Sequence, residues 1–393
     1  MEIKTGAAQM QNGCYLCSAG NLTHVKEHHF YYEKDDTFRI FNYYFCRNCG
    51  FVSVYPQTDS GFLKEFYSTY SDLTDTSEIE RTQEVMRYLK GYASVIGLNE
   101  KSRIIDVGSG DGHLIHFLSM EGLGMVYGVE PSAPRRDRSG KAYGLSNLYR
   151  SLEEVPDNIR FDLLVCAHVI EHVVDPLSFV KKLSSLLNEE GAMYIELPGY
   201  LTDRKQFPDM VFSHLSCFSL RSLHEMLNRS GLTVISGEHY TGLSVPVLRV
   251  LAKKGRVDAP SASKENVEDL FKSVVEREKM YWEFIRNAAE RVSHNSSKGI
   301  KTVIWPSGTD TRELLFLTGD KLDKKYVLLV DSDASKHEKK IAGFQINQPD
   351  SIKTFCDAES EIVICSAYSN TRESIIDDIR KLYPVLSEKI IVF

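Results

Sequence analysis

Four stretches of the chain differ in how hydrophobic and polar residues alternate. Residues 1–60 contain short alternating runs such as FRIFNYYF, which predict strands. Residues 61–98 change to a helical pattern, seen in GFLKEFYSTYSD and SEIERTQEVMRYLKGYASVIG. Residues 103–253 alternate between amphipathic segments and the apolar runs RIIDVG, MVYGVE, FDLLVCAH and AMYIELP. Strands that alternate with helices predict a parallel sheet with helices on both faces.

The carboxy-terminal part repeats this alternation on a smaller scale. Residues 254–298 are highly charged and predict a linker helix through FKSVVEREKMYWEFIRNAAERVSH. Residues 299–393 contain the apolar runs KTVIWPSG, YVLLVDSD, EIVICSAY and KIIVF. The pattern predicts an α/β protein. A zinc-binding domain (1–60) would precede a Rossmann-like domain (61–253, with a helical segment at 61–98), a linker helix and a smaller α/β domain (299–393).

Composition narrows the class of protein. The 393 residues carry a net charge of −7, with 42% hydrophobic and 26% charged residues, which is typical of a folded protein and not of a disordered or collagen-like chain. The acidic balance disfavours nucleic-acid binding. The amino end, MEIKTGAAQMQNG, predicts no signal peptide, and no apolar run approaches the roughly 20 residues that span a bilayer. We therefore expect a cytoplasmic protein, monomeric or homodimeric, that does not bind membranes.

Four of the eight cysteines form two CxxC pairs, Cys14–Cys17 and Cys46–Cys49. In the cytoplasm thiols stay reduced, so this spacing predicts a tetrahedral zinc site rather than disulfides. Gly50 suits the tight turn after the second pair. Four thiolates leave no open position, so we expect a structural ion. The intervening histidines (His24, His28 and His29) are expected to be surface or packing residues. The remaining four cysteines are expected to be packing residues.

A glycine-rich loop follows the first strand of the Rossmann-like region. Asp106 lies in the apolar run, and the loop contains Gly108, Gly110 and Gly112 before a helix. Glu130 ends the next strand, 18 residues later, where a carboxylate can bind both hydroxyls of a ribose. A carboxylate at Asp106 would repel a pyrophosphate but attract an ammonium group. A ligand with a ribose and a cationic amino-acid end is S-adenosylmethionine (SAM), which these residues are expected to bind.

The same region resembles the class I SAM-dependent methyltransferases. FDLLVCAHVIEHVVDP, residues 161–176, is similar to their fourth strand and following helix, and AMYIELPG to their fifth strand. The resemblance covers roughly residues 100–240. It implies that His168 and His172 help to shape the SAM and acceptor pocket.

The whole chain resembles a narrower group, the nucleotide-sugar C-methyltransferases. The order of a CxxC…CxxC domain, a helix with Phe66-Tyr67 and Tyr70, a SAM domain and a carboxy-terminal α/β domain is similar to theirs. In that family a phrase like YHEHLSYFS follows the fifth strand. This chain has VFSHLSCFS at residues 211–219, with His214 retained and Val211 and Ser213 at the tyrosine and glutamate positions. The resemblance implies a nucleotide-linked deoxysugar as acceptor, held between the SAM domain and the carboxy-terminal domain.

Methyl transfer to a carbanion or hydroxyl needs a base, and histidine suits that role near neutral pH. His214 is our first candidate because it follows a parallel strand, where open sheets bind ligands. His168 and His172 are further candidates. The expected acceptor contacts are Tyr67, Tyr70, Phe212 and Tyr368.

The carboxy-terminal domain offers less specific signals. Ser307-Gly308 and Asp331 follow its first two strands, and Ser366, Tyr368 and Asn370 follow a later one. One glycine does not predict a dinucleotide site, so a platform for the sugar nucleotide or for a neighbouring subunit is the preferred interpretation.

Three functions compete at this point. The first is C-methylation of a nucleotide sugar by deprotonation next to a keto group. The second is O-methylation of a sugar hydroxyl or another small metabolite, which the changes at Val211 and Ser213 favour. The third is a zinc-ribbon nucleic-acid-binding protein with a degenerate SAM fold. The intact loop and Glu130 disfavour it, as does the lack of a basic cluster beyond Lys336, Lys339 and Lys340, with Glu338 among them.

Overall fold

The computed structural model describes residues 13–56, 78–199, 210–243, 246–255 and 263–393. These residues form two compact units. The first comprises Met1–His24, Tyr44–Thr202 and Ser213–Phe271, and the second comprises Val25–Tyr43, Asp203–Phe212 and Lys272–Phe393. The four-part division expected from the sequence stays a prediction.

The first unit is built on a seven-stranded sheet in the order β10-β11-β8-β7-β4-β5-β6. The chain leaves β4 toward β5 on one side and returns to β7 on the other. Ligands bind at the carboxyl ends of strands where the order reverses in this way. The strands are β4 (Arg103–Val107), β5 (Met125–Val129), β6 (Leu148–Tyr149), β7 (Phe161–Ala167), β8 (Leu187–Pro198), β10 (Leu232–Tyr240) and β11 (Val247–Lys254).

The expectation of a parallel sheet is wrong for one strand. Strands β4 to β8 pair in parallel, but β11 is antiparallel to both β8 and β10. Neither β10 nor β11 was predicted. The apolar run of β11 is interrupted by Arg249, which is buried all the same, 2% exposed, because it pairs with Glu196 of β8. The sheet is therefore mixed.

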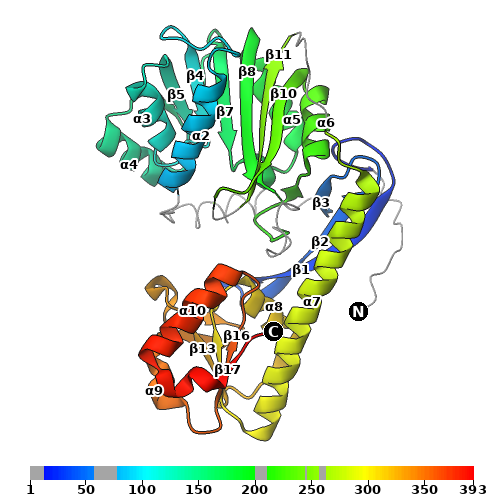
Figure 1. The fold of residues 1–393 in the computed structure, drawn as a ribbon, viewed down its shortest axis with the longest axis vertical. Helices are drawn as coiled ribbons and strands as arrows, with labels where there is room; N and C mark the ends of the chain where they lie inside the picture. Colours follow the sequence, from blue (N-terminus) through cyan, green and yellow to red (C-terminus); the bar gives the residue numbers. More distant parts are fainter. Residues whose placement is uncertain (1–12, 57–77, 200–209, 244–245, 256–262) are drawn as a thin grey trace. The chain divides into compact units, whose positions relative to one another are not determined.

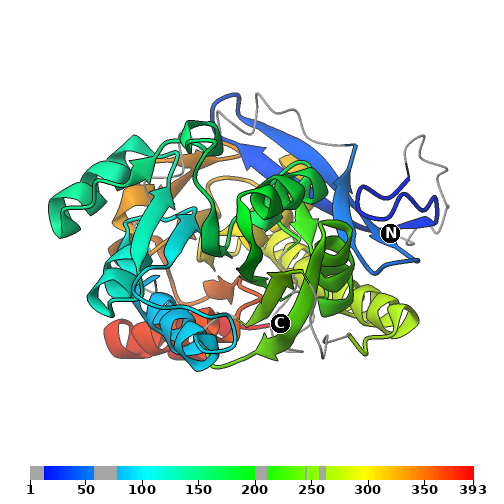
Figure 2. The same ribbon diagram turned by 90° about the horizontal axis from the view of Figure 1, so that it is seen from above.

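Helices cover both faces of this sheet because side chains alternate between its faces. Ile104 of β4 packs with α2 and α3, whereas the next residue, Ile105, belongs to the core that contains α5 and α6. Figure 1 shows this layering, and Figure 2 shows it from above. The helices are α2 (Glu78–Tyr92), α3 (His113–Met120), α4 (Ala133–Tyr143), α5 (Pro176–Ser185) and α6 (Leu220–Arg229).

Gly128 of β5 allows α3 to approach the sheet closely. A Cβ atom at this position would lie 2.5 Å from Ile115 Cδ1 of α3 and 2.7 Å from Leu148 Cδ2 of β6. Real Cβ atoms do not approach other heavy atoms so closely. The absence of a side chain at Gly128 thus leaves room for the side chains of Ile115 and Leu148 beside the glycine-rich loop.

A four-stranded sheet has the order β1-β2-β3-β9. Two of its strands, β1 (Leu22–Tyr32) and β2 (Thr37–Cys46), run from one unit into the other. The shorter strands β3 (Val52–Tyr55) and β9 (Ser216–Cys217) are antiparallel and belong to the first unit. Helix α7 (Val267–Lys298) contains the expected linker helix and begins in the first unit.

The second unit contains a six-stranded sheet in the order β14-β15-β13-β12-β16-β17. Ile304 of β12 packs in the core with residues of α7 and α8, and Val303 and Trp305 face α10. No helix among the described residues is long and apolar enough to cross a membrane. The elements are β12 (Thr302–Trp305), α8 (Thr309–Thr318), β13 (Val327–Val330), β14 (Lys340–Ile341), β15 (Phe344–Asn347), α9 (Ile352–Phe355), β16 (Glu361–Ile364), α10 (Ser369–Leu382) and β17 (Ile390–Ile391).

Candidate active site

The glycine-rich loop connects β4 to α3 at the point where the strand order reverses. Gly108, Gly110 and Gly112 all have positive φ, at +81°, +54° and +82°, a conformation that disfavours residues with a side chain. A Cβ atom at Gly108 would lie 2.3 Å from Cγ2 of Val169. The backbone can therefore follow this tight path, and come close to a ligand, only with glycine.

Glu130 lies directly after β5 and is 7% exposed. One of its carboxylate oxygens accepts a hydrogen bond from the Gly110 amide at 2.9 Å, and the other accepts one from the Ser132 amide at 2.8 Å. Burial raises the pKa of Glu130, partly offset by these two hydrogen bonds. The two amides hold the carboxylate in place, and each oxygen keeps a lone pair for a hydroxyl group.

Asp106 is a buried carboxyl group in β4, 4% exposed. Among the described residues, none donates a hydrogen bond to its side chain. Burial raises its pKa to about 7, and the nearby carboxylates of Glu130 and Glu78 act in the same direction. Such a site gains from a cationic ligand, because the ligand would compensate the buried negative charge.

The end of β7 carries His168, which has an unusual positive φ of +55°. Its Nδ1 atom lies 3.5 Å from Glu171 Oε1, and its Nε2 atom lies 3.6 Å from Glu196 Oε1. Burial lowers the pKa of His168, but the two carboxylates outweigh this effect and raise it to about 9. His168 therefore holds its proton at neutral pH, which suits a cation in the site better than a base.

Glu196 extends this network into β11. Its Oε2 atom accepts hydrogen bonds from Arg249 Nε at 2.8 Å and from the Tyr194 hydroxyl at 2.7 Å. The Arg249 guanidinium lies 3.5 Å from the centre of the Tyr240 ring. These contacts fix Glu196, and Glu196 in turn helps to fix His168.

His172 and His214 lie together. Their ring centres are 5.1 Å apart, and His172 Nδ1 lies 2.6 Å from the carbonyl oxygen of Ser213. His172 Nε2 is 3.7 Å from Glu171 Oε1. Glu171, His172 and His214 form a cluster whose ligand atoms all lie within 4.8 Å of one another. The structure thus places the three candidate histidines, His168, His172 and His214, around the buried Glu171.

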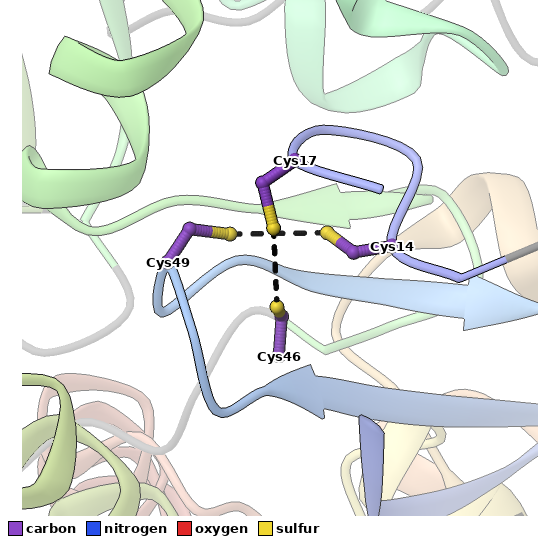
Figure 3. Close-up of side chains that lie close together, drawn as sticks. All are labelled: Cys14, Cys17, Cys46 and Cys49. Carbon is purple, nitrogen blue, oxygen red and sulfur yellow. Dashed lines mark hydrogen bonds between the residues drawn. The ribbon is translucent and has the colours of Figure 1, made fainter. Parts of the chain in front are cut away.

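The four cysteines of the two CxxC pairs converge on one point (Figure 3). The Sγ atoms of Cys14 and Cys49 are 3.8 Å apart, and those of Cys17 and Cys46 are 3.6 Å apart. Four sulfurs about 2.3 Å from a tetrahedral zinc ion would be about 3.8 Å from one another. The donor set and its dimensions therefore fit zinc.

Two similar turns hold these cysteines. In the first, the Cys14 carbonyl accepts a hydrogen bond from Ser18, and in the second the Cys46 carbonyl accepts one from Gly50. Ser18 and Gly50 both have positive φ, at +63° and +76°. Gly50 is placed as the sequence predicts, whereas the corresponding role of Ser18 was not predicted.

The histidines between the two pairs lie apart from the sulfurs. His28 and His29, both in the second unit, each place Nδ1 2.6 Å from a carboxylate oxygen of Glu313. His24 packs edge-on against Tyr44, with ring centres 5.2 Å apart. The three histidines thus pack against other side chains, and the zinc ligand set stays a prediction.

The expected acceptor contacts are distributed differently. Tyr67 and Tyr70 lie outside the described residues. Phe212 belongs to the second unit and is buried against Phe30, with ring centres 3.9 Å apart. Tyr368, also in the second unit, is 37% exposed at the start of α10. Their role as acceptor contacts stays a prediction.

In the second unit, as at the glycine-rich loop, a carboxylate that follows one strand accepts a hydrogen bond from a backbone amide in the loop after the neighbouring strand. Asp331 follows β13 and accepts hydrogen bonds from the Ser307 amide at 3.0 Å and the Ser307 hydroxyl at 2.8 Å. Lys336 Nζ lies 3.0 Å from the same oxygen. The Asp331 carboxylate is therefore already paired.

Sequence reasoning missed the buried acids of the candidate site. Neither Glu171, which directly precedes His172, nor Glu196 was predicted as a site residue. An ionisable residue inside an otherwise apolar strand, such as Glu196 in AMYIELP, is a signal that could have identified it. Arg249 gives the same signal in β11.

Comparisons with known proteins give matches to methyltransferases. Residues 79–237 match the family model of a methyltransferase domain. The ubiquinone biosynthesis O-methyltransferase of Bradyrhizobium diazoefficiens is 35% identical over 99 residues, which cover 24% of this chain and 38% of that protein. The corresponding protein of Neisseria meningitidis serogroup A is 25% identical over 116 residues, or 27% and 47% of the two chains. The chain thus spans about half or less of the length of these relatives.

Solved structures that match include the 1,6-didemethyltoxoflavin-N1-methyltransferase of Burkholderia thailandensis. It has a TM-score of 0.41 and 15% identity and covers 53% of this chain and 97% of its own. The magnesium protoporphyrin IX methyltransferase of Synechocystis has a TM-score of 0.39 and 13% identity, and covers 50% and 100%.

The family match covers the segment that contains the glycine-rich loop, Glu130 and the histidine cluster. The sheet order and the loop geometry of that segment agree with a Rossmann-like nucleotide-binding architecture. Residues 79–237 form a class I SAM-dependent methyltransferase domain.

Proposed function

We propose that the protein transfers the methyl group of SAM to a small-molecule acceptor that loses a proton beside His172 and His214. One observation carries the proposal. The glycine-rich loop with Glu130, which suits SAM, and the histidine cluster lie at the carboxyl ends of β4, β5 and β7, at the reversal of strand order.

In this proposal, different residues of the chain bind different parts of SAM. Glu130 binds the ribose hydroxyls, and the backbone of the loop leaves room for the ligand. The negative charge of Asp106 attracts the positively charged ammonium group of the methionine part of SAM. The methyl carbon leaves the sulfonium in line with the attacking atom, so alignment of the two molecules supplies much of the catalysis. Charged groups such as the buried Glu171 and the partly exposed His168 are already oriented before the reaction begins.

For the acceptor we propose a nucleotide-linked deoxysugar that is methylated on carbon next to a keto group. The support is the resemblance of the whole chain, from the CxxC pairs to the carboxy-terminal α/β unit, to the nucleotide-sugar C-methyltransferases. His214 and the final Phe218-Ser219 of the VFSHLSCFS phrase are retained in this resemblance. It lies in the histidine cluster, where an acceptor can lose its proton.

O-methylation is the second candidate. Val211 and Ser213 replace the tyrosine and glutamate of the C-methylating family. In addition, the relatives named above are O-methyltransferases of ubiquinone biosynthesis, which share 24–27% of this chain's length. A sugar hydroxyl is the simplest acceptor that satisfies both lines of support.

We further propose that Cys14, Cys17, Cys46 and Cys49 bind a structural zinc ion. The distances between their sulfur atoms support this. The ion would connect residues far apart in the sequence in a segment that is too short to build a large core of its own.

The test combines the full-length protein with methyl-labelled SAM and two panels, nucleotide-linked 4-keto-6-deoxy sugars and the corresponding 4-hydroxy sugars. The mass and position of any transferred methyl identify the reaction. A methyl on carbon supports the first candidate, and a methyl on oxygen supports the second.

His214→Ala should reduce turnover and leave SAM affinity within about twofold, because the residue acts on the acceptor. His116→Ala, a partly buried histidine of α3 outside the cluster, is the matched control. Full turnover of His214→Ala would contradict the place assigned to deprotonation, and SAM binding without transfer to either panel would contradict the sugar acceptor.

A further inference from the structure

We propose that Glu171, His172 and His214 bind a divalent transition-metal cation at the acceptor side of the methyltransferase domain. Two histidines and one carboxylate are a common ligand set for Mn²⁺, Fe²⁺, Co²⁺ and Zn²⁺, and they leave positions open for other ligands. The role given to the cation deepens the proposed function, but binding of the cation does not depend on it.

The geometry of His172 is the first observation. Its Nδ1 atom lies 2.6 Å from the Ser213 carbonyl oxygen, so Nδ1 must carry the proton and donate. In a neutral ring this leaves the lone pair on Nε2, the ring nitrogen nearer to Glu171. Histidines that bind metals typically donate their other N–H to a backbone carbonyl in this way, because the hydrogen bond fixes both the tautomer and the ring orientation.

The state of Glu171 is the second, independent observation. Its side chain is almost fully buried, and neither carboxylate oxygen has a hydrogen-bond donor among the described residues. The nearest nitrogen atoms are His168 Nδ1 at 3.5 Å and His172 Nε2 at 3.7 Å from Oε1. The ion pair with His168 is longer than a normal hydrogen bond, so both carboxylate oxygens can still bind a cation.

The distances fit a shared ion after a small adjustment. The three ligand atoms lie within 4.8 Å of one another. Two ligands about 2.1 Å from one ion can be at most about 4.2 Å apart. The separation of 3.7 Å between His172 and Glu171 already meets this limit. A shift of about half an ångström at His214, which is partly exposed, would complete the set.

The cation would act on the acceptor. An acceptor oxygen bound at an open position becomes more acidic, as water does on a metal ion, and its proton passes to solvent water. The acceptor atom then forms a bond to the methyl carbon while the bond from that carbon to the sulfonium breaks and its electron pair stays on sulfur. For C-methylation the cation would hold the keto oxygen instead, the carbon beside the keto group would lose its proton to solvent water, and that same carbon would take the methyl.

The test uses the full-length protein and Mn²⁺ as the probe. Mn²⁺ is a hard cation, so the four cysteines compete poorly for it. After treatment with a chelator, the protein is titrated with Mn²⁺ and the free ion is measured by electron paramagnetic resonance. We expect one equivalent to bind to the wild-type protein outside the cysteine site. Glu171→Gln and His214→Gln should each weaken this binding by about tenfold or more.

Matched controls are Glu121→Gln and His116→Gln, which change the same residue types on α3 and its end, outside the cluster. If Glu171→Gln fails to fold, as judged by circular dichroism and SAM affinity, His214→Gln decides, since that side chain is less buried. Absence of Mn²⁺ binding at millimolar concentration, or equal binding by the variants and the wild type, would overturn the proposal.

Turnover separates this proposal from the proposed function. If Mn²⁺ binds and restores turnover after chelation, both are supported. If Mn²⁺ binds but no methyl transfer to either sugar panel occurs, the cation site stands and the acceptor proposal fails. If no Mn²⁺ binds and methyl transfer is unaffected by the chelator, the cation site is overturned while the methyltransferase proposal stands.

Discussion

Replacing Asp106 by asparagine should separate the stability of the methyltransferase domain from its affinity for SAM. The pKa of Asp106 rises from its ordinary value of 3.8 to about 7, with burial as the main cause and the nearby carboxylates Glu130 and Glu78 as further causes. The raised pKa means that the folded state favours the protonated form. Stability from this group is therefore complete below pH 3.8, decreases as the pH rises, and is lost above about pH 7.

The size of the effect follows from the shift. A change of about three pKa units corresponds to about 4 kcal/mol, at about 1.4 kcal/mol per unit. The amide side chain of the Asp106→Asn variant cannot ionise. The free energy of unfolding of this variant, relative to the wild type, should therefore increase by about 4 kcal/mol between about pH 4 and pH 8. Any constant cost of burying the amide group cancels in this comparison.

The affinity of the wild-type protein for SAM should increase with pH, whereas its stability should decrease. The proposed site places the ammonium group of SAM where the Asp106 carboxylate attracts it, so wild-type affinity should fall as the pH drops below about 7. The variant should bind SAM more weakly than the wild type at about pH 8, with little dependence on pH.

Urea unfolding of the ligand-free protein at about pH 4, 6 and 8 measures the first effect, and calorimetric titration with SAM measures the second. Asp137→Asn, an exposed position on α4, is the matched control and should change neither quantity. A constant difference in stability between Asp106→Asn and the wild type across this range would refute the reasoning about burial. Unchanged SAM affinity would refute the role of the carboxylate.

Four further changes test other parts of the structure. Glu130→Ala should weaken SAM binding by about 1–3 kcal/mol, measured by calorimetry, because the ribose hydroxyls lose their acceptor; equal affinity would contradict the site. Gly108→Ala should also weaken SAM binding, because its Cβ atom would meet Val169 at 2.3 Å and the loop must shift; pairing it with Val169→Ala should restore part of the affinity. Cys46→Ala should reduce zinc content, measured by atomic absorption, and lower the unfolding temperature, whereas a zinc-free wild type of equal stability would contradict a structural ion. Glu313→Gln should lower stability by about 2–4 kcal/mol in chemical unfolding, because the buried carboxylate accepts from two imidazole groups; a loss below about 0.5 kcal/mol would show that the contacts contribute little.

The sequence predicted the local features of the fold well. The strands β4, β5, β7 and β8 are continuous apolar runs, and the CxxC pairs and the glycine-rich loop are short motifs whose geometry depends on neighbouring residues. Such local signals can be recognised without knowledge of the tertiary structure. The carbonyl-to-amide turns at Cys14 and Cys46 have this local character too.

The rest depends on residues that meet only in the folded chain. Strand β11 escaped prediction because Arg249 interrupts its apolar pattern, and Glu196, 53 positions away, is what makes its burial possible. The contact between His172 and the Ser213 carbonyl also joins distant positions, so no periodicity could indicate it. The sequence placed the histidines near the site but could not show which groups surround them.

The close approach of α3 to the sheet at Gly128 restricts how this domain can diverge. A larger residue at position 128 would require smaller side chains at both Ile115 and Leu148, which belong to two other elements. A single substitution would force the side chains of Ile115, Leu148 and Ser109 to shift, and Ser109 belongs to the glycine-rich loop. We therefore expect positions 115, 128 and 148 to covary across homologous sequences, and a variant library of this domain to tolerate changes there only in combination.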